Sequence, residues 1–202
     1  MTVITDLPEL TLRSCDAIWD RAKWELLPDD GNRYEIIDGV LYMTTAPSAF
    51  HQWIIRQIFL ALYQSIDSVG VGVTLWSPIG LFMPGCEPVQ PDLIVIRSTD
   101  ISIIHDRRIF GVPALIIEVL SPSNADKDTD TKRKAYARAG LPEYWIVRPS
   151  SRDVLVCTGP DAALGDYTQS QLVAPDAELV SPTLPLRVAV DTFFAGAPDT
   201  TV

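Results

Sequence analysis

Two acidic residues belong to short apolar runs in this chain, and they restrict how the chain can fold. Asp92 begins the run Asp92–Ile96, and Glu118 lies inside the run Ala114–Leu120. Both runs are short and rich in β-branched residues, so each predicts a buried strand. A carboxylate in a buried strand is costly unless it is paired with a cation or bound to a metal ion. The fold is therefore expected to bring a counter-charge to both side chains.

A third charged residue, Lys132, follows in a basic segment whose pattern predicts a helix from about 125 to 139. Lys132 lies four residues after Asp128 and four before Tyr136, so the three side chains fall on one stripe of that helix. Two acids and a lysine are the groups that metal-dependent cleavage of a phosphodiester needs. The acids hold Mg²⁺ (or Mn²⁺), and the lysine orients water or offsets developing charge.

The same residues also have structural interpretations. Asp92 can be a strand-entry residue after a proline, Glu118 can form a buried ion pair with an arginine, and Lys132 can be a solvated helix lysine. The three-dimensional arrangement has to decide between these alternatives.

The charge of the chain is unevenly distributed. The net charge of −10 argues against nonspecific coating of nucleic acid. Between Arg107 and Arg152, however, there are nine basic and five acidic residues, a net +4, whereas the rest of the chain carries −14. This segment contains Glu118 and Lys132, so one basic face could still steer a polyanion. A solvated helix face is the alternative explanation.

The length of 202 residues and the mixture of periodicities predict one α/β (mixed α+β) domain at 16–195, between a flexible segment 1–15 and a tail 196–202. Asp38-Gly39 is typical of a two-residue hairpin turn, and Ser48 is a suitable N-cap. The other expected elements are helices at 16–26 and 48–66, strands at 69–82 with a break near Ser77-Pro78, a hairpin of 144–147 with 154–156, and weaker strands at 167–173 and 186–190.

The sequence also predicts where the protein works. No apolar stretch approaches the roughly 18 residues that a membrane span needs, and the N-terminus lacks the pattern of a secretory signal. Cys15, Cys86 and Cys157 lie far apart without a CxxC pair, which favours reduced thiols over a zinc site. We expect a cytoplasmic protein without a membrane partner.

Four blocks of the chain, in this order, carry a resemblance that spans roughly residues 16–195. They are Tyr34–Gly39; Val89–Asp92; Glu118–Ser123; and Asp128 with Lys132, Tyr136, Gly140 and Glu143–Trp145. Pro91-Asp92 with Glu118 resembles the core of PD-(D/E)XK nucleases. Together the blocks resemble the Uma-two (Uma2) family of restriction-type endonucleases.

The resemblance implies a restriction-endonuclease-like fold, with a central mixed sheet flanked by helices and an N-terminal β-hairpin. It also implies a divalent metal and DNA as the substrate. Asp92 and Glu118 would match the metal-binding carboxylates, and Glu35 would match an additional acid of the first block.

The chain departs from the general nuclease motif at its lysine. That motif has a lysine two residues after the glutamate, where this chain has Leu120. Lys132 on the following helix would take its place, with Lys134 as a less well aligned substitute. His51, Lys134 and Tyr136 are further candidates for substrate contact, although a structural hydrogen bond is the alternative for His51.

The leading functional hypothesis is a Mg²⁺-dependent endonuclease that acts on DNA. The alternative is a catalytically silent nuclease-fold module that binds nucleic acid or a protein partner. A hydrolase of small phosphate esters is less favoured, because the chain has no glycine-rich phosphate loop or histidine cluster. We also expect a homodimer, since cutting two strands benefits from paired sites and two-fold symmetry is the commonest assembly.

Overall fold

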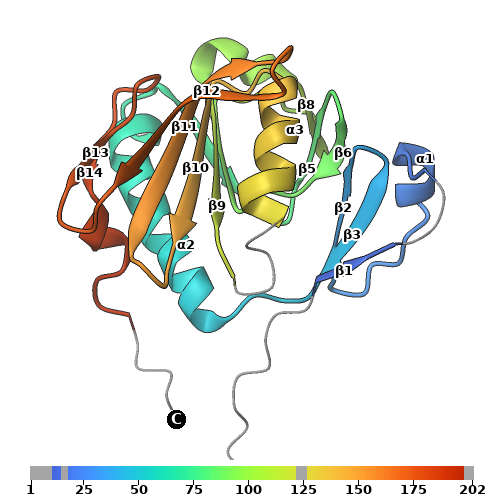
Figure 1. The fold of residues 1–202 in the computed structure, drawn as a ribbon, viewed down its shortest axis with the longest axis horizontal. Helices are drawn as coiled ribbons and strands as arrows, with labels where there is room; N and C mark the ends of the chain where they lie inside the picture. The colour runs from blue at the N-terminus through green and yellow to red at the C-terminus, as the bar shows by residue number, and fades with distance from the viewer. Residues whose placement is uncertain (1–10, 15–17, 122–126, 198–202) are drawn as a thin grey trace, which may run out of the picture.

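The centre of the fold is a six-stranded mixed sheet. The computed structural model describes residues 11–14, 18–121 and 127–197. The strand order of the central sheet is β12-β11-β10-β9-β7-β4; β9 and β10 pair in parallel and the other neighbours antiparallel (Figure 1). Its strands are β4 (Gly72–Trp76), β7 (Leu93–Arg97), β9 (Leu115–Val119), β10 (Glu143–Arg148), β11 (Asp153–Asp161) and β12 (Asp166–Val173).

A second sheet has the order β1-β3-β2-β6-β5-β8. Asp38 and Gly39 both have positive φ, 50° and 75°, and they form the two-residue turn that the sequence predicts between β2 and β3. Thr11–Arg13, which we expected in a flexible segment, pair with β3 as an edge strand. The strands are β1 (Thr11–Arg13), β2 (Arg33–Ile37), β3 (Val40–Thr44), β5 (Gly80–Met83), β6 (Cys86–Val89) and β8 (Arg108–Phe110).

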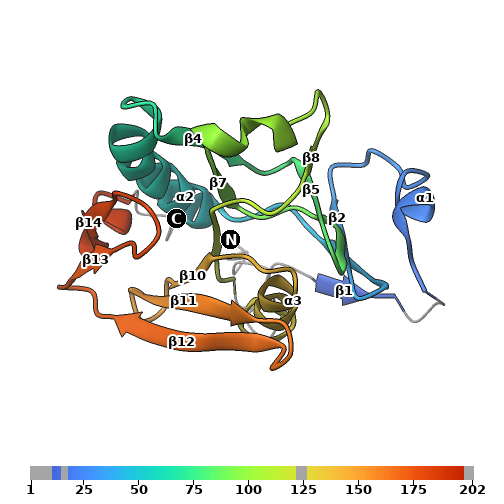
Figure 2. The same cartoon turned by 90° about the horizontal axis from the view of Figure 1, so that it is seen from above.

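The two sides of the central sheet are covered by different elements (Figure 2). Odd-numbered residues of β7 and β9, such as Val95 and Ile117, pack in one cluster with Ile58 of α2 (Ala49–Leu62). Even-numbered residues, such as Ile94, pack in a second cluster with the second sheet and with α3 (Arg133–Arg138). Because side chains alternate along a strand, Asp92 and Glu118 belong to the side that carries α3.

The helices match the sequence pattern only in part. Ser48 caps α2 by accepting a hydrogen bond from His51 N, and the helix continues as a π-helical turn at Tyr63–Asp67, as the predicted range 48–66 requires. Residues 16 and 17 of the predicted helix 16–26 lie outside the described part of the chain, and the helix in the rest is a single turn, α1 (Arg21–Trp24), which has no buried residue. A helix that buries nothing gains too little from packing to extend.

The predicted helix 125–139 consists of two parts. A π-helical turn at Lys127–Lys132 leads into α3, and residues 122–126 lie outside the described part of the chain. Within the described ranges, no helix is both long and apolar enough to cross a membrane. The remaining elements are the 3₁₀ turns Ser98–Ile103 and Val190–Phe193 and a small sheet of β13 (Glu178–Val180) and β14 (Arg187–Ala189).

Candidate active site

Asp92 and Glu118 lie side by side at one end of the central sheet. β7 and β9 pair with Leu93 opposite Ile117, so the register continued by one residue puts Asp92 level with Glu118. Asp92 Oδ2 also accepts a hydrogen bond of 2.8 Å from Val119 N. Both carboxylates are buried, with exposed fractions of 2% and 1%. The structure therefore brings the two predicted acids together on one side of the sheet.

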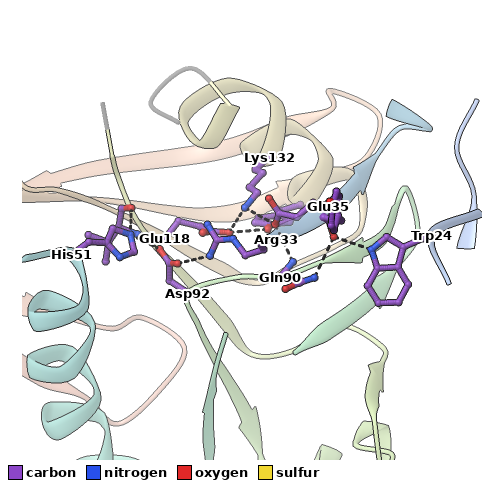
Figure 3. A network of polar contacts seen from close by, with 11 residues as sticks. Trp24, Arg33, Glu35, His51, Gln90, Asp92, Glu118 and Lys132 are labelled. Atoms are coloured by element: carbon purple, nitrogen blue, oxygen red, sulfur yellow. Dashed lines mark hydrogen bonds and ion pairs between the residues drawn. The ribbon is translucent and has the colours of Figure 1, made fainter. Parts of the chain in front are cut away.

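Lys132 links the central sheet to the second sheet (Figure 3). Its side chain is fully buried, and its Nζ lies 2.9 Å from Glu35 Oε1 and 2.7 Å from Glu118 Oε1. Glu35 comes from β2 and Glu118 from β9. The interpretation of Lys132 as a solvated helix lysine is therefore wrong, and the predicted third acid, Glu35, belongs to the same cluster.

Tyr136 lies one helical turn after Lys132 and donates a hydrogen bond of 3.1 Å from its hydroxyl to Glu118 Oε1. Burial and the charges of Glu118 and Glu35 raise the pKa of Tyr136 well above its ordinary value. The hydroxyl therefore stays protonated and keeps donating. The side chain of Asp128, the third member of the predicted stripe, lies outside the described part of the chain.

Arg33 is the counter-charge of Asp92. Its Nη1 lies 2.9 Å from Asp92 Oδ1. Burial alone would lower the pKa of Arg33, but the charges of Asp92, Glu35 and Glu118 raise it above its ordinary value, so the guanidinium stays charged. The sequence allows a buried ion pair between Glu118 and an arginine. In the structure Asp92 forms the pair with an arginine, and Glu118 is paired with a lysine.

His51 approaches Asp92 from α2, across the end of the sheet. Its Nε2 lies 2.9 Å from Val119 O and 3.2 Å from Asp92 Oδ2. Both neighbours are acceptors, so Nε2 carries the proton and donates. Burial opposes the charged imidazole, but the charge of Asp92 raises the pKa of His51 overall. His51 therefore makes a structural hydrogen bond to Val119 O, which was one of the two roles considered for it from the sequence.

The donor chemistry of the cluster fits a hard divalent cation. Among the described residues, no three His, Cys, Asp or Glu side chains are grouped so that they could hold an ion by themselves. Asp92 Oδ2 and the carbonyl oxygen of Val119, however, both face the same N–H group of His51. A carboxylate oxygen and a carbonyl oxygen are ligands that Mg²⁺ and Mn²⁺ prefer, and Mg²⁺ needs only one or two carboxylates because it keeps several waters.

Lys134 and much of the basic segment do not join the cluster. Lys134 Nζ lies 2.6 Å from Asp130 Oδ1 in an exposed pair one turn apart. Three arginines of the segment are likewise paired with acids: Arg133 with Asp166, Arg138 with Asp38, and Arg148 with Asp153. The local excess of positive charge that the sequence indicates is therefore largely neutralised within the fold.

The sequence interpretation missed Arg33 and gave no role to Gln90. The backbone N of Gln90 donates to Glu35 Oε1 at 2.9 Å, and its side chain donates to Tyr34 O at 3.2 Å. Arg33 lies one residue before the strand that the sequence predicts at 34–37, and its place two residues before Glu35 is the one signal that pointed to it. Residues two apart in a strand point to the same side.

The comparisons with known proteins identify a family and a similar fold. The model of the Uma2 family, described as "Putative restriction endonuclease", matches residues 21–192. A crystal structure of a putative nuclease belonging to DUF820 from Anabaena variabilis is similar in fold, with a TM-score of 0.73 at 17% sequence identity. The match covers 88% of this chain and 98% of that chain. No curated protein matches the chain.

Proposed function

This chain belongs to the Uma2 family of putative restriction endonucleases, and we propose that it is a divalent-metal-dependent endonuclease that hydrolyses DNA. The observation that carries the proposal is the buried convergence of Asp92, Glu118 and Glu35 with Lys132. Three carboxylates held together in a protein interior need cations, and a phosphodiester nuclease uses the same groups to hold a metal ion.

Asp92 and Glu118 would hold Mg²⁺ or Mn²⁺, with the carbonyl of Val119 beside them. The ion, when bound, supplies a Lewis acid and lowers the pKa of a bound water. Lys132 Nζ lies 2.7 Å from Glu118 and 2.9 Å from Glu35 and fixes both carboxylates, and its positive charge would offset the charge that develops on the phosphate. Substrate can approach through a cavity of about 180 Å³ that Asp92 and Arg33 line.

The test is cleavage of supercoiled plasmid DNA by the purified protein with Mg²⁺ or Mn²⁺. Wild-type protein is expected to nick or linearise the plasmid, and EDTA is expected to stop the reaction. Asp92→Asn and Glu118→Gln are each expected to lower the rate at least 100-fold, since each removes a charge from the ion's site.

Glu143→Gln is the matched control. Glu143 is as buried as Glu118, but it accepts hydrogen bonds from Trp145 Nε1 at 2.6 Å and Ser181 Oγ at 2.7 Å, outside the cluster. The Glu143→Gln protein is expected to cleave at the wild-type rate. Cleavage that survives both site variants would refute the assignment. DNA binding without metal-stimulated cleavage would favour a catalytically silent module.

We further propose that the enzyme works in the cytoplasm. Cys86 and Cys157 are buried free thiols, which suits a reducing compartment. Fractionation of the host cells, with this protein detected by an antibody, is expected to find it with soluble cytoplasmic markers. Recovery with markers of an oxidising compartment would contradict this location.

A further inference from the structure

A large cleft lies next to the acid cluster and has no part in the chemistry described above. Its volume is about 920 Å³, which is within the range of ligand-binding sites. Its lining comes from α1 and the segment after it and from the residues around β8. Figure 3 shows Trp24, a residue of this cleft, at the opposite end of the polar network from His51.

The walls combine guanidinium groups with aromatic rings. The guanidinium carbon of Arg108 lies 4.9 Å from the ring centre of Trp24, and that of Arg21 lies 5.1 Å from the ring centre of Phe110. Tyr34 adds a third ring to the lining. Nucleobases that are not paired in a duplex stack on rings and on guanidinium planes of this kind.

The cleft also holds a donor that has no acceptor. Arg108 Nε is buried and makes no hydrogen bond within the described part of the protein. Arg108 as a whole is only partly buried, so a base carbonyl or a phosphate oxygen would reach Nε through a rotation of the side chain. The charges of the lining are balanced, with three arginines and three carboxylates, and Glu25 is already paired with Arg21 at 2.8 Å. Such a lining is unsuited to a long polyanion, but it suits one flat base.

The cleft adjoins the approach to the acids. The smaller cavity beside Asp92 shares Asn32, Pro78 and Gln90 with the large cleft. Gln90 contacts both sides, because its backbone N donates to Glu35 and its side chain donates to Tyr34 O, which also accepts from Trp24 Nε1 at 2.9 Å. A strand whose phosphate lies at Asp92 would therefore find the cleft beside that phosphate.

We propose that this cleft receives an unpaired nucleobase of the DNA strand, next to the phosphate that lies at the acids. The inference rests on the proposed nuclease function and narrows its substrate to DNA that is single-stranded or locally unpaired. Arg108 and Trp24 are the residues that contact the base.

The experiment is fluorescence anisotropy with a labelled 12-nucleotide single strand and the matching duplex, in EDTA so that nothing is cleaved. The wild-type protein is expected to bind the single strand at least tenfold more tightly than the duplex. Arg108→Ala and Trp24→Leu are each expected to weaken single-strand binding about tenfold, the order of one stacked base. Trp24→Phe, which keeps a ring, is expected to restore most of the affinity.

Arg56→Ala is the matched control, because Arg56 lies 5.0 Å from the ring centre of Trp53 and lines neither cavity. It is expected to bind as the wild type does. Equal affinity of the Arg108→Ala and wild-type proteins for the single strand, or tighter binding of the duplex, would overturn the proposal. Full displacement by an equimolar amount of free deoxyadenosine monophosphate would also overturn it, because the cleft would then be a site for free nucleotides.

The two proposals fail in different ways. If single-strand binding depends on Arg108 but the wild-type protein cleaves no plasmid DNA with Mg²⁺ or Mn²⁺, the base site stands and the nuclease function fails. If plasmid cleavage depends on Asp92 and Glu118 while Arg108→Ala changes neither binding nor cleavage, the nuclease function stands and the base site fails.

Discussion

At the scale of single residues, the most constrained group in this protein is the ammonium of Lys132. It lies within 3 Å of two carboxylates from different sheets, and all three side chains are buried. Breaking a buried pair from one side costs about 3–5 kcal/mol, because the remaining charge loses its counter-charge. Lys132 therefore contributes to the stability of the fold as well as to the proposed chemistry.

The first prediction concerns this ammonium. Lys132→Met is expected to lower the free energy of unfolding by about 3–5 kcal/mol, because Glu118 and Glu35 would face each other without it. Urea denaturation followed by fluorescence measures the change. Lys134→Met, two residues away, removes only an exposed pair with Asp130 and is expected to cost less than about 1 kcal/mol. If the two variants lost similar amounts of unfolding free energy, Lys132 would not be needed to balance the charges of Glu118 and Glu35.

The second prediction concerns Arg33, which occupies Asp92 Oδ1. A cation that binds Asp92 has to compete with this guanidinium. Arg33→Met is therefore expected to tighten Mn²⁺ binding several-fold, as measured by isothermal titration calorimetry, and to enlarge the rise in Tm that Mn²⁺ produces. In the absence of metal, the same variant is expected to unfold more easily, because Asp92 loses its partner. Weaker Mn²⁺ binding in this variant would indicate that Arg33 supports the ion's site instead.

At the scale of helices and strands, the sequence was informative where local chemistry and burial agree. The Asp38-Gly39 hairpin, both apolar strands and α2 are all present, although Asp92 lies one residue before its strand (Leu93–Arg97), because turn geometry and apolar periodicity act within a few residues. The pairing of β2 with β6 and the seating of β1 on β3 depend on long-range contacts. No local pattern in Thr11–Arg13 or Cys86–Val89 encodes those partners.

The site was predictable to a similar degree. The acids could be found because a carboxylate in an apolar strand is conspicuous, and Lys132 because helical spacing aligns it with Tyr136. Arg33 and the carbonyl of Val119 could not be assigned in the same way. An arginine is ordinary on a half-exposed strand, and a backbone carbonyl carries no sequence signal. The neutralisation of the basic segment could not be predicted either, because Arg133, Arg138 and Arg148 pair with acids on other elements.

The third prediction concerns the start of α2, which carries His51 towards Asp92. Ser48 Oγ accepts a hydrogen bond of 3.2 Å from His51 N. Ser48→Ala is expected to lower the free energy of unfolding by about 1 kcal/mol, because the first turn loses its cap. Ser48→Asp, which can cap, is expected to restore it. A loss in both variants, measured by thermal denaturation, would show that the cap is unimportant and that the serine is needed for another reason.

At the scale of the whole molecule, the negative charge and the paired arginines limit how DNA can be held. A protein of net charge −10 in which Arg133, Arg138 and Arg148 are already paired with acids is not suited to wrap a duplex through many phosphate contacts. Its affinity has to come from a few places, namely the acids with their ion and, by our inference, the base cleft. We therefore expect a shallow dependence of DNA binding on salt concentration.

The last prediction concerns assembly. Under the proposed function, one acid cluster in each chain would cut one strand, so a monomer is expected to nick plasmid DNA, whereas a two-fold dimer with paired sites would cut both strands in one encounter. We expect a homodimer of about 45 kDa from the 22.3 kDa chain in multi-angle light scattering. We also expect linear plasmid to form without a build-up of the nicked form. A 22 kDa species that accumulates nicked circles first would contradict the dimer. Mixing wild-type protein with an excess of Glu118→Gln separates the cases, because only a dimer would form hybrids that convert linearisation into nicking.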